Sequence, residues 1–107
     1  MNWHGNYATQ PELRIDRLKE IAEVVKCPLV LHGGTGLTKE DFQNCLANGI
    51  KKINIATASY DSVAARIKKV GKEKPDANYF DFSRAAVDAT CENIEEHMLI
   101  FGLKGRA

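Results

Sequence analysis

The sequence lacks the features that mark membrane, secreted and nucleic-acid-binding proteins. No apolar run approaches the roughly 20 residues that a membrane helix needs. The first residues, Met1-Asn2-Trp3-His4-Gly5, show neither the charged segment nor the apolar stretch of a signal peptide. The net charge is only +1, so no basic surface for nucleic acid or anionic lipid is indicated. We therefore expect a cytoplasmic globular protein with no nucleic-acid or membrane partner.

Cysteine is scarce and its spacing is irregular. The chain has three cysteines, Cys27, Cys45 and Cys91, and no CxxC pair. An odd number at wide spacing does not fit a disulfide framework, and without a CxxC pair a cysteine-rich zinc site is not expected. We predict reduced, mostly buried thiols.

Two familiar phosphate-binding motifs are also absent. Gly34-Thr35-Gly36 begins a GxGxxG motif, but Lys39 occupies the position of the third glycine. The segment Gly36-Leu37-Thr38-Lys39 lacks the Gly-Lys-Ser/Thr of a P-loop. Both nucleotide-binding motifs are therefore excluded.

What the chain does contain is a regular alternation of helices and strands. Apolar spacing and turn residues predict four helices, two buried strands and one polar loop. The helices are expected over 11–25, from Thr38 to Gly49 and along the apolar face Tyr60 to Val70. The last helix is expected to begin at a Ser83 cap, with an apolar face that includes Val87, Thr90, Ile94, Met98 and Phe101. The strands are expected over 28–31 and 51–56, and the loop over 71–77. A further strand is expected to end at Trp3-His4.

This α/β alternation predicts a parallel sheet with right-handed crossovers. Two or three strands are too few for a doubly wound domain, and both outer strands would have open edges. A complete (β/α)8 barrel, the TIM barrel, takes about 250 residues. We expect residues 1–107 to form the carboxyl-terminal segment of one such barrel domain, incomplete at its amino end.

Polar residues follow both strands at their carboxyl ends, where α/β proteins keep their ligand sites. The first strand runs into His32-Gly33-Gly34-Thr35-Gly36. His32 suits a zinc ligand, a base or a phosphate donor; it equally suits a half-buried histidine bonded to a backbone carbonyl. The glycines permit positive φ, and their successive N–H groups predict an anion-binding nest. A plain tight turn is the alternative.

The second strand runs into Asn54-Ile55-Ala56-Thr57. A carboxamide in an isoleucine-rich strand is costly to bury without a hydrogen bond. Asn54 therefore indicates either a ligand contact or a bond to the neighbouring strand. Thr57 suits a helix cap and also a phosphate contact. His4 precedes a glycine as His32 does, so two imidazoles at adjacent strand ends can reach one metal ion. His97 is expected to be a solvated surface residue.

Several of these motifs follow one another in an order that matches a known family. They are His4-Gly5-Asn6-Tyr7, Pro11, Leu18 with Glu20-Ile21, Leu29 through Leu37, Asn54 through Thr57, and Phe101-Gly102 with Gly105-Arg106-Ala107. Together they resemble the carboxyl-terminal part of the class II, zinc-dependent ketose-bisphosphate aldolases, which act on fructose or tagatose 1,6-bisphosphate. Ala56 resembles the tagatose-type branch more than the branch with aspartate there.

This resemblance implies a (β/α)8 barrel and roles for ten residues. His4 and His32 match two of the family's three zinc-ligand histidines. Gly5, Gly33, Gly34 and Thr35 match positions that bind the phosphate of dihydroxyacetone phosphate or a nearby monovalent cation. Asn54 matches a position near the ketone, and the backbone of Ile55, Ala56 and Thr57 a position near the phosphate. The implied reaction is the zinc-assisted, reversible aldol cleavage of a ketose 1,6-bisphosphate to dihydroxyacetone phosphate and glyceraldehyde 3-phosphate.

The family's third zinc histidine and its catalytic acid and base lie upstream of the matched motifs. No catalytic residue is therefore expected in this chain, which we predict to be inactive alone and to associate with a missing amino-terminal segment or with further copies of itself. Two alternatives remain. One is a non-catalytic, phosphate-binding or self-associating remnant of the barrel; the other is a phosphosugar enzyme of the same fold without zinc.

Overall fold

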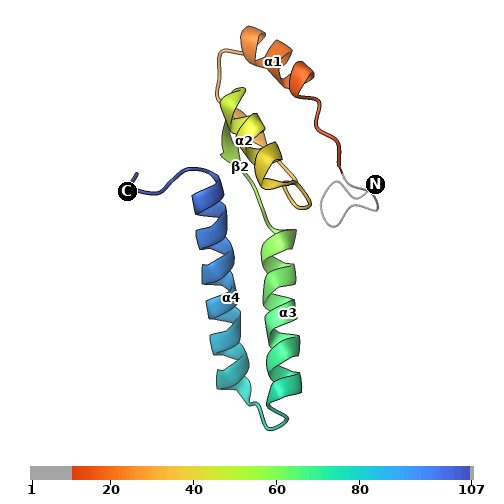
Figure 1. Cartoon of the computed structure of the whole chain (residues 1–107), viewed down its shortest axis with the longest axis vertical. Coiled ribbons are helices and arrows are strands. Elements are labelled where there is room, and N and C mark those ends of the chain that lie inside the picture. Colours follow the sequence, from red (N-terminus) through yellow and green to blue (C-terminus); the bar gives the residue numbers. More distant parts are fainter. Residues whose placement is uncertain (1–10, 107) are drawn as a thin grey trace.

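The computed structural model describes residues 11–106 as an α/β arrangement of four helices and two parallel strands (Figure 1). In chain order the elements are α1 (Ile15–Val24), β1 (Leu29–Leu31), α2 (Lys39–Ala47), β2 (Ile50–Ile53), α3 (Thr57–Glu73) and α4 (Tyr79–Ile100). The strand expected at Trp3-His4 lies outside the described residues. The alternation of helices with parallel strands is confirmed.

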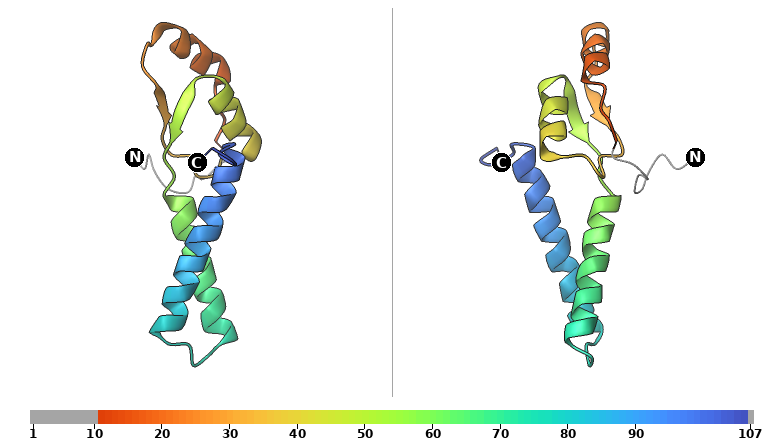
Figure 2. Two further views of the ribbon diagram at one scale, coloured as in Figure 1. Left: turned by 90° about the vertical axis from the view of Figure 1, so that its left-hand side faces the viewer. Right: turned by 45° about the vertical axis from the view of Figure 1, so that its right-hand side comes forward.

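The molecule has two parts, a small sheet with α1 and α2 and a long hairpin made by α3 and α4 (Figure 1). The Cα atoms extend over 58 × 37 × 20 Å. Figure 2 shows that α3 and α4 approach each other near the loop that joins them and separate toward the sheet. No helix within residues 11–106 is long and apolar enough to cross a lipid bilayer.

Strands β1 and β2 pair in parallel, with Leu31 opposite Ile53. Both expected strands are confirmed, although the second is shorter than predicted and ends at Ile53. Its last ladder bond is made just beyond the strand, where the Asn54 N–H donates to the Leu31 carbonyl over 2.9 Å. This register places the residues that follow the two strands next to each other.

Helix α2 begins as its sequence predicts. The Thr38 hydroxyl accepts from the Asp41 N–H over 3.1 Å, and the Asp41 carboxylate accepts from the Thr38 N–H over 2.9 Å. This reciprocal capping box satisfies two backbone donors that would otherwise have no partner. Gly49 follows the helix with φ of +113°, a conformation that favours glycine.

Other helix boundaries were predicted wrongly. Helix α1 begins at Ile15 and not at Pro11, and α3 continues through Gly71 to Glu73, so the predicted loop starts later. Helix α4 begins four residues before Ser83, because Asn78 is its cap. The Asn78 side-chain oxygen accepts from the N–H groups of Phe80 and Asp81, and Asp81 accepts from the Asn78 N–H.

Helices α3 and α4 pack through small side chains. Ala85 and Ala89 are 6% and 1% exposed, and an ion pair joins Arg66 to Glu92 across the two helices. Small residues let two helix backbones approach closely, which explains why this stripe is the one that is buried. The Lys74 ammonium group holds the Asp81 carboxylate at 3.0 Å beside the connecting loop.

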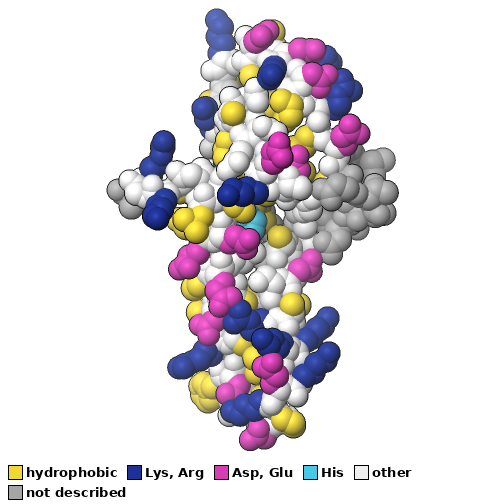
Figure 3. Space-filling view, viewed as in Figure 1, with side chains coloured by type: hydrophobic (Ala, Val, Ile, Leu, Met, Phe, Trp, Pro, Cys, Tyr) yellow, Lys and Arg dark blue, Asp and Glu magenta, His cyan; other side chains and the backbone are white. Residues whose placement is uncertain are grey.

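The larger apolar stripe expected along the last helix remains exposed. Val87 is 59% exposed, and Ile94 and Met98 are each 48% exposed. Figure 3 shows hydrophobic side chains at the surface between charged groups in both parts of the molecule. This stripe is available to pack against further protein.

A small core lies between α2 and the sheet, where Phe42, Cys45 and Ile50 are buried. The Phe42 ring meets the Phe101 ring edge to face at a centroid distance of 5.2 Å and the His97 ring at 6.1 Å. His97 is therefore half-buried in an aromatic cluster, and the expectation of a solvated surface residue was wrong. The cluster attaches the end of α4 to α2.

The three cysteines are free thiols, as predicted. Cys45 is buried, and this burial, together with the nearby Asp41 charge, raises the pKa of its thiol. Cys27 and Cys91 are exposed, so the prediction of mostly buried thiols was wrong.

Candidate functional site

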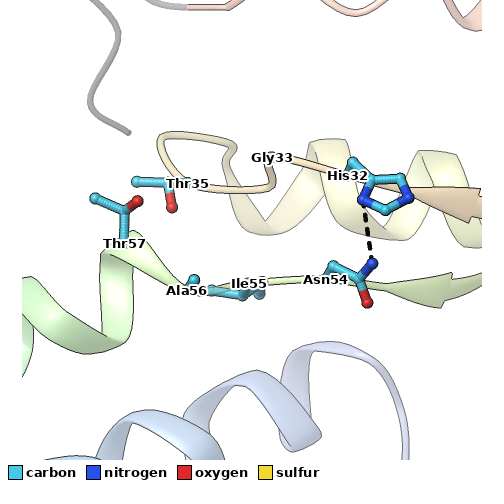
Figure 4. A pocket seen from close by; sticks show the side chains of 7 residues that line it. All are labelled: His32, Gly33, Thr35, Asn54, Ile55, Ala56 and Thr57. Carbon is cyan, nitrogen blue, oxygen red and sulfur yellow. Dashed lines mark hydrogen bonds between the residues drawn. The ribbon is translucent and has the colours of Figure 1, made fainter. Parts of the chain in front are cut away.

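The carboxyl ends of β1 and β2 enclose a pocket of about 210 Å³. Figure 4 shows that its lining comes from two segments that lie side by side, one after each strand. The residues that line it are His32, Gly33, Thr35, Asn54, Ile55, Ala56 and Thr57. Seven of the eight described residues that the sequence singled out are thus brought together; Gly34 is the exception.

His32 and Asn54 stand at one end of this pocket (Figure 4). The Asn54 Nδ2 atom lies 3.2 Å from the His32 Nδ1 atom. A neutral imidazole has one N–H donor and one acceptor nitrogen, so a partner on one nitrogen determines the role of the other. This bond joins two strand ends and was one of the two readings that the sequence left open for Asn54.

The glycine turn after His32 depends on two different properties of glycine. Gly33 has φ of +68°, in the left-handed region that side chains disfavour. Gly34 is needed for space, because a Cβ atom there would lie 3.0 Å from Cε1 of Phe42. Gly34 therefore packs the turn onto α2 and does not line the pocket. Its role in binding phosphate stays a prediction.

Thr35 stands at the other end of the pocket, near Thr57 (Figure 4). The Thr35 hydroxyl accepts a hydrogen bond from the Ala58 N–H over 3.2 Å. Ala58 belongs to the first turn of α3, so this bond fastens the glycine turn to the start of the helix. The sequence identified Thr35 as a ligand residue but did not predict this contact.

Helix α3 begins directly at the pocket. Its cap residue is Ala56, which has no side-chain oxygen, and Thr57 is the first helical residue. The prediction that Thr57 is a cap was therefore wrong. The amino end of a helix carries a partial positive charge and backbone N–H groups that favour an anion. The pocket thus combines a helix start with a glycine turn, an arrangement that suits phosphate.

The described residues supply only some of the side chains that a metal ion would need as ligands. Among residues 11–106, no group of three or more His, Cys, Asp or Glu side chains is close enough to hold an ion. His32 fits the part of one imidazole ligand. The Asn54 amide nitrogen donates to Nδ1 of this ring, so Nε2 carries the proton; a metal ion at Nε2 would need the carboxamide to turn so that Oδ1 accepts from the Nδ1 N–H. His4 and Gly5, the other predicted metal and phosphate residues, lie outside the described residues.

No carboxylate lines the pocket in the described part of the chain. Its polar groups are an imidazole, a carboxamide, two hydroxyls and backbone amides. These groups bind and orient a ligand, whereas proton transfer to or from carbon needs a base of suitable geometry. The site in residues 11–106 is therefore equipped mainly for binding.

Comparison with known proteins points to one family. The family model described as fructose-bisphosphate aldolase class-II matches residues 2–106. Among solved structures, the chain is similar to the YdjI aldolase from Escherichia coli K12, with a TM-score of 0.85 and 30% sequence identity. The match covers 96% of this chain and 38% of that one. The chain thus spans well under half the length of that aldolase.

Proposed function

The chain belongs to the class II fructose-bisphosphate aldolase family, and from this premise we propose that it supplies one side of an aldolase active site. The proposed reaction is the zinc-assisted, reversible cleavage of a ketose 1,6-bisphosphate to dihydroxyacetone phosphate and glyceraldehyde 3-phosphate. The observation that carries the proposal is the single pocket in which the two strand ends bring together His32, Asn54, Thr35 and Thr57.

The phosphate of dihydroxyacetone phosphate would lie at the Thr35 end of the pocket. Gly33, Thr35 and the segment Ile55 to Thr57 surround this end, and α3 begins there. Backbone N–H groups at a helix start stabilise an anion, and holding a remote phosphate orients the reacting carbons. Gly34 would contribute by keeping the glycine turn packed against α2. We also propose that a monovalent cation binds beside the phosphate.

The ketone end of the substrate would lie near His32 and Asn54. His32 would hold the zinc ion together with His4 and a further histidine. The Asn54 carboxamide lies beside the His32 ring; turned so that Oδ1 accepts from the ring N–H, it would orient the ring, and otherwise it would contact the substrate oxygen. A zinc ion held by neutral imidazoles supplies a Lewis acid that polarises a carbonyl group. The two ends of the pocket then separate the reacting group from its phosphate handle.

We also propose that residues 1–107 are the carboxyl-terminal part of a (β/α)8 barrel. Parallel strands alternating with helices are the pattern that such a barrel repeats, and β1 and β2 follow it. The match to the solved aldolase covers 38% of that longer chain, which leaves room there for the other strands of a barrel. In such barrels the loops after the last two strands commonly bind phosphate, as proposed for the glycine turn and the Ile55–Thr57 segment.

The catalytic acid and base would come from the remainder of the barrel, because no carboxylate lines the pocket in the described residues. The exposed apolar side chains of α4 support association with that remainder or with further copies of the chain. The same lack of a carboxylate favours one other candidate function, a non-catalytic module that binds phosphate or self-associates.

Reconstitution distinguishes the two functions. The chain is co-expressed with the amino-terminal portion of a class II aldolase that lacks the matching segment, and cleavage of fructose and tagatose 1,6-bisphosphate is measured with zinc present. The enzyme reading predicts activity that neither part has alone and that His32→Ala abolishes. A stable assembly that binds phosphate without any cleavage would favour the non-catalytic module.

A further inference from the structure

Helix α3 has no cap of its own. The residue at its cap position is Ala56, and no side chain of that residue satisfies the first backbone N–H groups. A cap residue normally accepts from the second or third N–H of the helix through a side-chain oxygen. Helix α3 is the only helix of this chain's described residues to start at the candidate pocket, so its missing cap falls at the functional site.

The missing oxygen comes from the other strand end. Thr35 precedes Ala58 by 23 residues, yet its hydroxyl accepts from the Ala58 N–H over 3.2 Å, and this contact is half-buried. Ala58 is the second residue of α3, the position whose N–H a cap side chain ordinarily satisfies. The glycine turn therefore provides the cap that the local sequence lacks.

We propose that Thr35 is a positioning residue that holds the glycine turn and the start of α3 together as one preformed anion site. This inference rests on the proposed function, which places a phosphate between these two segments. It adds a role distinct from direct phosphate contact. The Thr35–Ala58 bond links the two segments directly, in addition to the strand pair, and so defines their spacing.

One hydroxyl can serve both purposes. A threonine oxygen that accepts one hydrogen bond still has its own proton to donate. Thr35 can therefore keep its bond to Ala58 while donating to a phosphate oxygen in the pocket. A bound anion would then strengthen the contact between the turn and the helix, and the Ala58 amide would become better protected from solvent exchange.

Amide hydrogen exchange of Ala58, followed by NMR in the full chain, tests this role. In the wild-type chain Ala58 should exchange more slowly than an unstructured amide, although it has no partner within its own helix. Thr35→Val keeps the branched shape and removes the hydroxyl, and Thr35→Ser keeps the hydroxyl. Loss of such a cap corresponds to a roughly fivefold faster exchange. We expect this change at Ala58 with valine and a return toward wild type with serine.

Thr57→Val is the matched control, because it removes the neighbouring hydroxyl and should leave Ala58 exchange unchanged. Wild-type Ala58 exchange at the rate of an unstructured amide would overturn the proposal without any variant. Unchanged Ala58 exchange in Thr35→Val would overturn it as well.

Titration with inorganic phosphate separates this inference from the proposed function. If both hold, phosphate slows Ala58 exchange in the wild type and binds Thr35→Val more weakly than Thr35→Ser. If phosphate shifts no amide signal of residues 33–35 or 55–58 in the wild type, the proposed phosphate site is wrong. The Ala58 exchange rates then still decide whether Thr35 caps the helix.

Discussion

Asn54 places its side-chain Nδ2 atom 3.2 Å from Nδ1 of His32, across the carboxyl ends of two paired strands. The two residues are 22 positions apart in the chain, and their proximity follows from the parallel register of Leu31 with Ile53. An imidazole held through one nitrogen has a fixed ring orientation and a defined role for the other nitrogen. The Asn54 amide nitrogen donates, so Nδ1 accepts and Nε2 carries the proton; a metal ion at Nε2 would require the carboxamide to turn and accept from Nδ1.

Loss of the Asn54 carboxamide should weaken metal binding more than it weakens folding. Partners that accept from the second ring N–H contribute about 10- to 100-fold to metal affinity. Asn54 would be such a partner in the zinc-bound enzyme with its carboxamide turned so that Oδ1 accepts from Nδ1, so we expect Asn54→Leu to lower the zinc affinity of the reconstituted enzyme by about that factor. Competition against a chromogenic chelator measures the affinity. Thr57→Val, at the other end of the pocket, is the control, and equal zinc affinity in Asn54→Leu and wild type would contradict the orienting role.

Gly34 and Gly71 should respond in opposite directions to alanine. A Cβ atom at Gly34 meets Phe42 at 3.0 Å, whereas a Cβ atom at Gly71, inside α3, meets Phe82 at an ordinary 3.7 Å. Crowding of this kind costs about 1–3 kcal/mol, while replacing a helical glycine by alanine gains roughly 1 kcal/mol. Urea denaturation should show Gly34→Ala destabilised and Gly71→Ala stabilised; equal effects would show that Gly34 is not tightly packed.

The cap of α4 should make the stability depend on pH in the acid range. Hydrogen bonding to the Asn78 N–H, and next the Lys74 ammonium, lowers the pKa of Asp81. A carboxyl group whose pKa is lower in the folded state stabilises the fold above its unfolded pKa, and this stabilisation is lost as pH falls through the folded pKa.

Asp81→Asn tests this contribution. The variant should be less stable than wild type at pH 7, and the difference should shrink below the ordinary aspartate value of about 3.9 as Asp81 becomes protonated. Urea midpoints at pH 7, pH 4 and pH 2.5 give the comparison. Asp88→Asn, at an exposed position of the same helix outside the cap, serves as a control for a simple change of charge. A constant difference across the pH range would contradict the prediction.

The exposed apolar stripe of α4 should promote association of the isolated chain. Val87 lies in an apolar groove between α3 and α4 and is 59% exposed. A charge placed there is costly to bury, so Val87→Glu should shift sedimentation toward the monomer. Lys19→Gln changes the net charge by the same amount on α1 and should not. A wild-type chain that stays monomeric at high concentration would rule out self-association through this stripe.

The pocket could be predicted from the sequence largely because each of its two segments is recognisable from a few consecutive residues. The glycine turn after His32 and the polar segment after Ile53 both follow short apolar runs, and parallel pairing necessarily brings two such strand ends together. The Thr38–Asp41 capping box was equally predictable, since its two partners are three residues apart. Structure that depends only on residues close together in the sequence can be predicted from the sequence alone.

Features that depend on distant segments were missed. His97 packs with Phe42 and Phe101 because α2 contacts the end of α4. No pattern of neighbouring residues predicts this contact between two distant helices. Two stripes run along α4, one of alanines and one of larger apolar residues, and the sequence alone favoured the larger. Close approach of α3 selected the alanines. The start of α4 did have a local signal, Asn78 with Asp81, which the nearby Ser83 obscured.

The central claim is that the two strand ends form one site for a sugar phosphate and its metal. The most direct measurement is a crystal structure of the chain assembled with the remainder of the barrel, with zinc and dihydroxyacetone phosphate bound. We predict that the phosphate contacts the Gly33–Thr35 turn and the Ile55–Thr57 segment, and that the His32 ring coordinates the metal. A phosphate bound elsewhere, or a His32 ring turned away from the metal, would contradict the account.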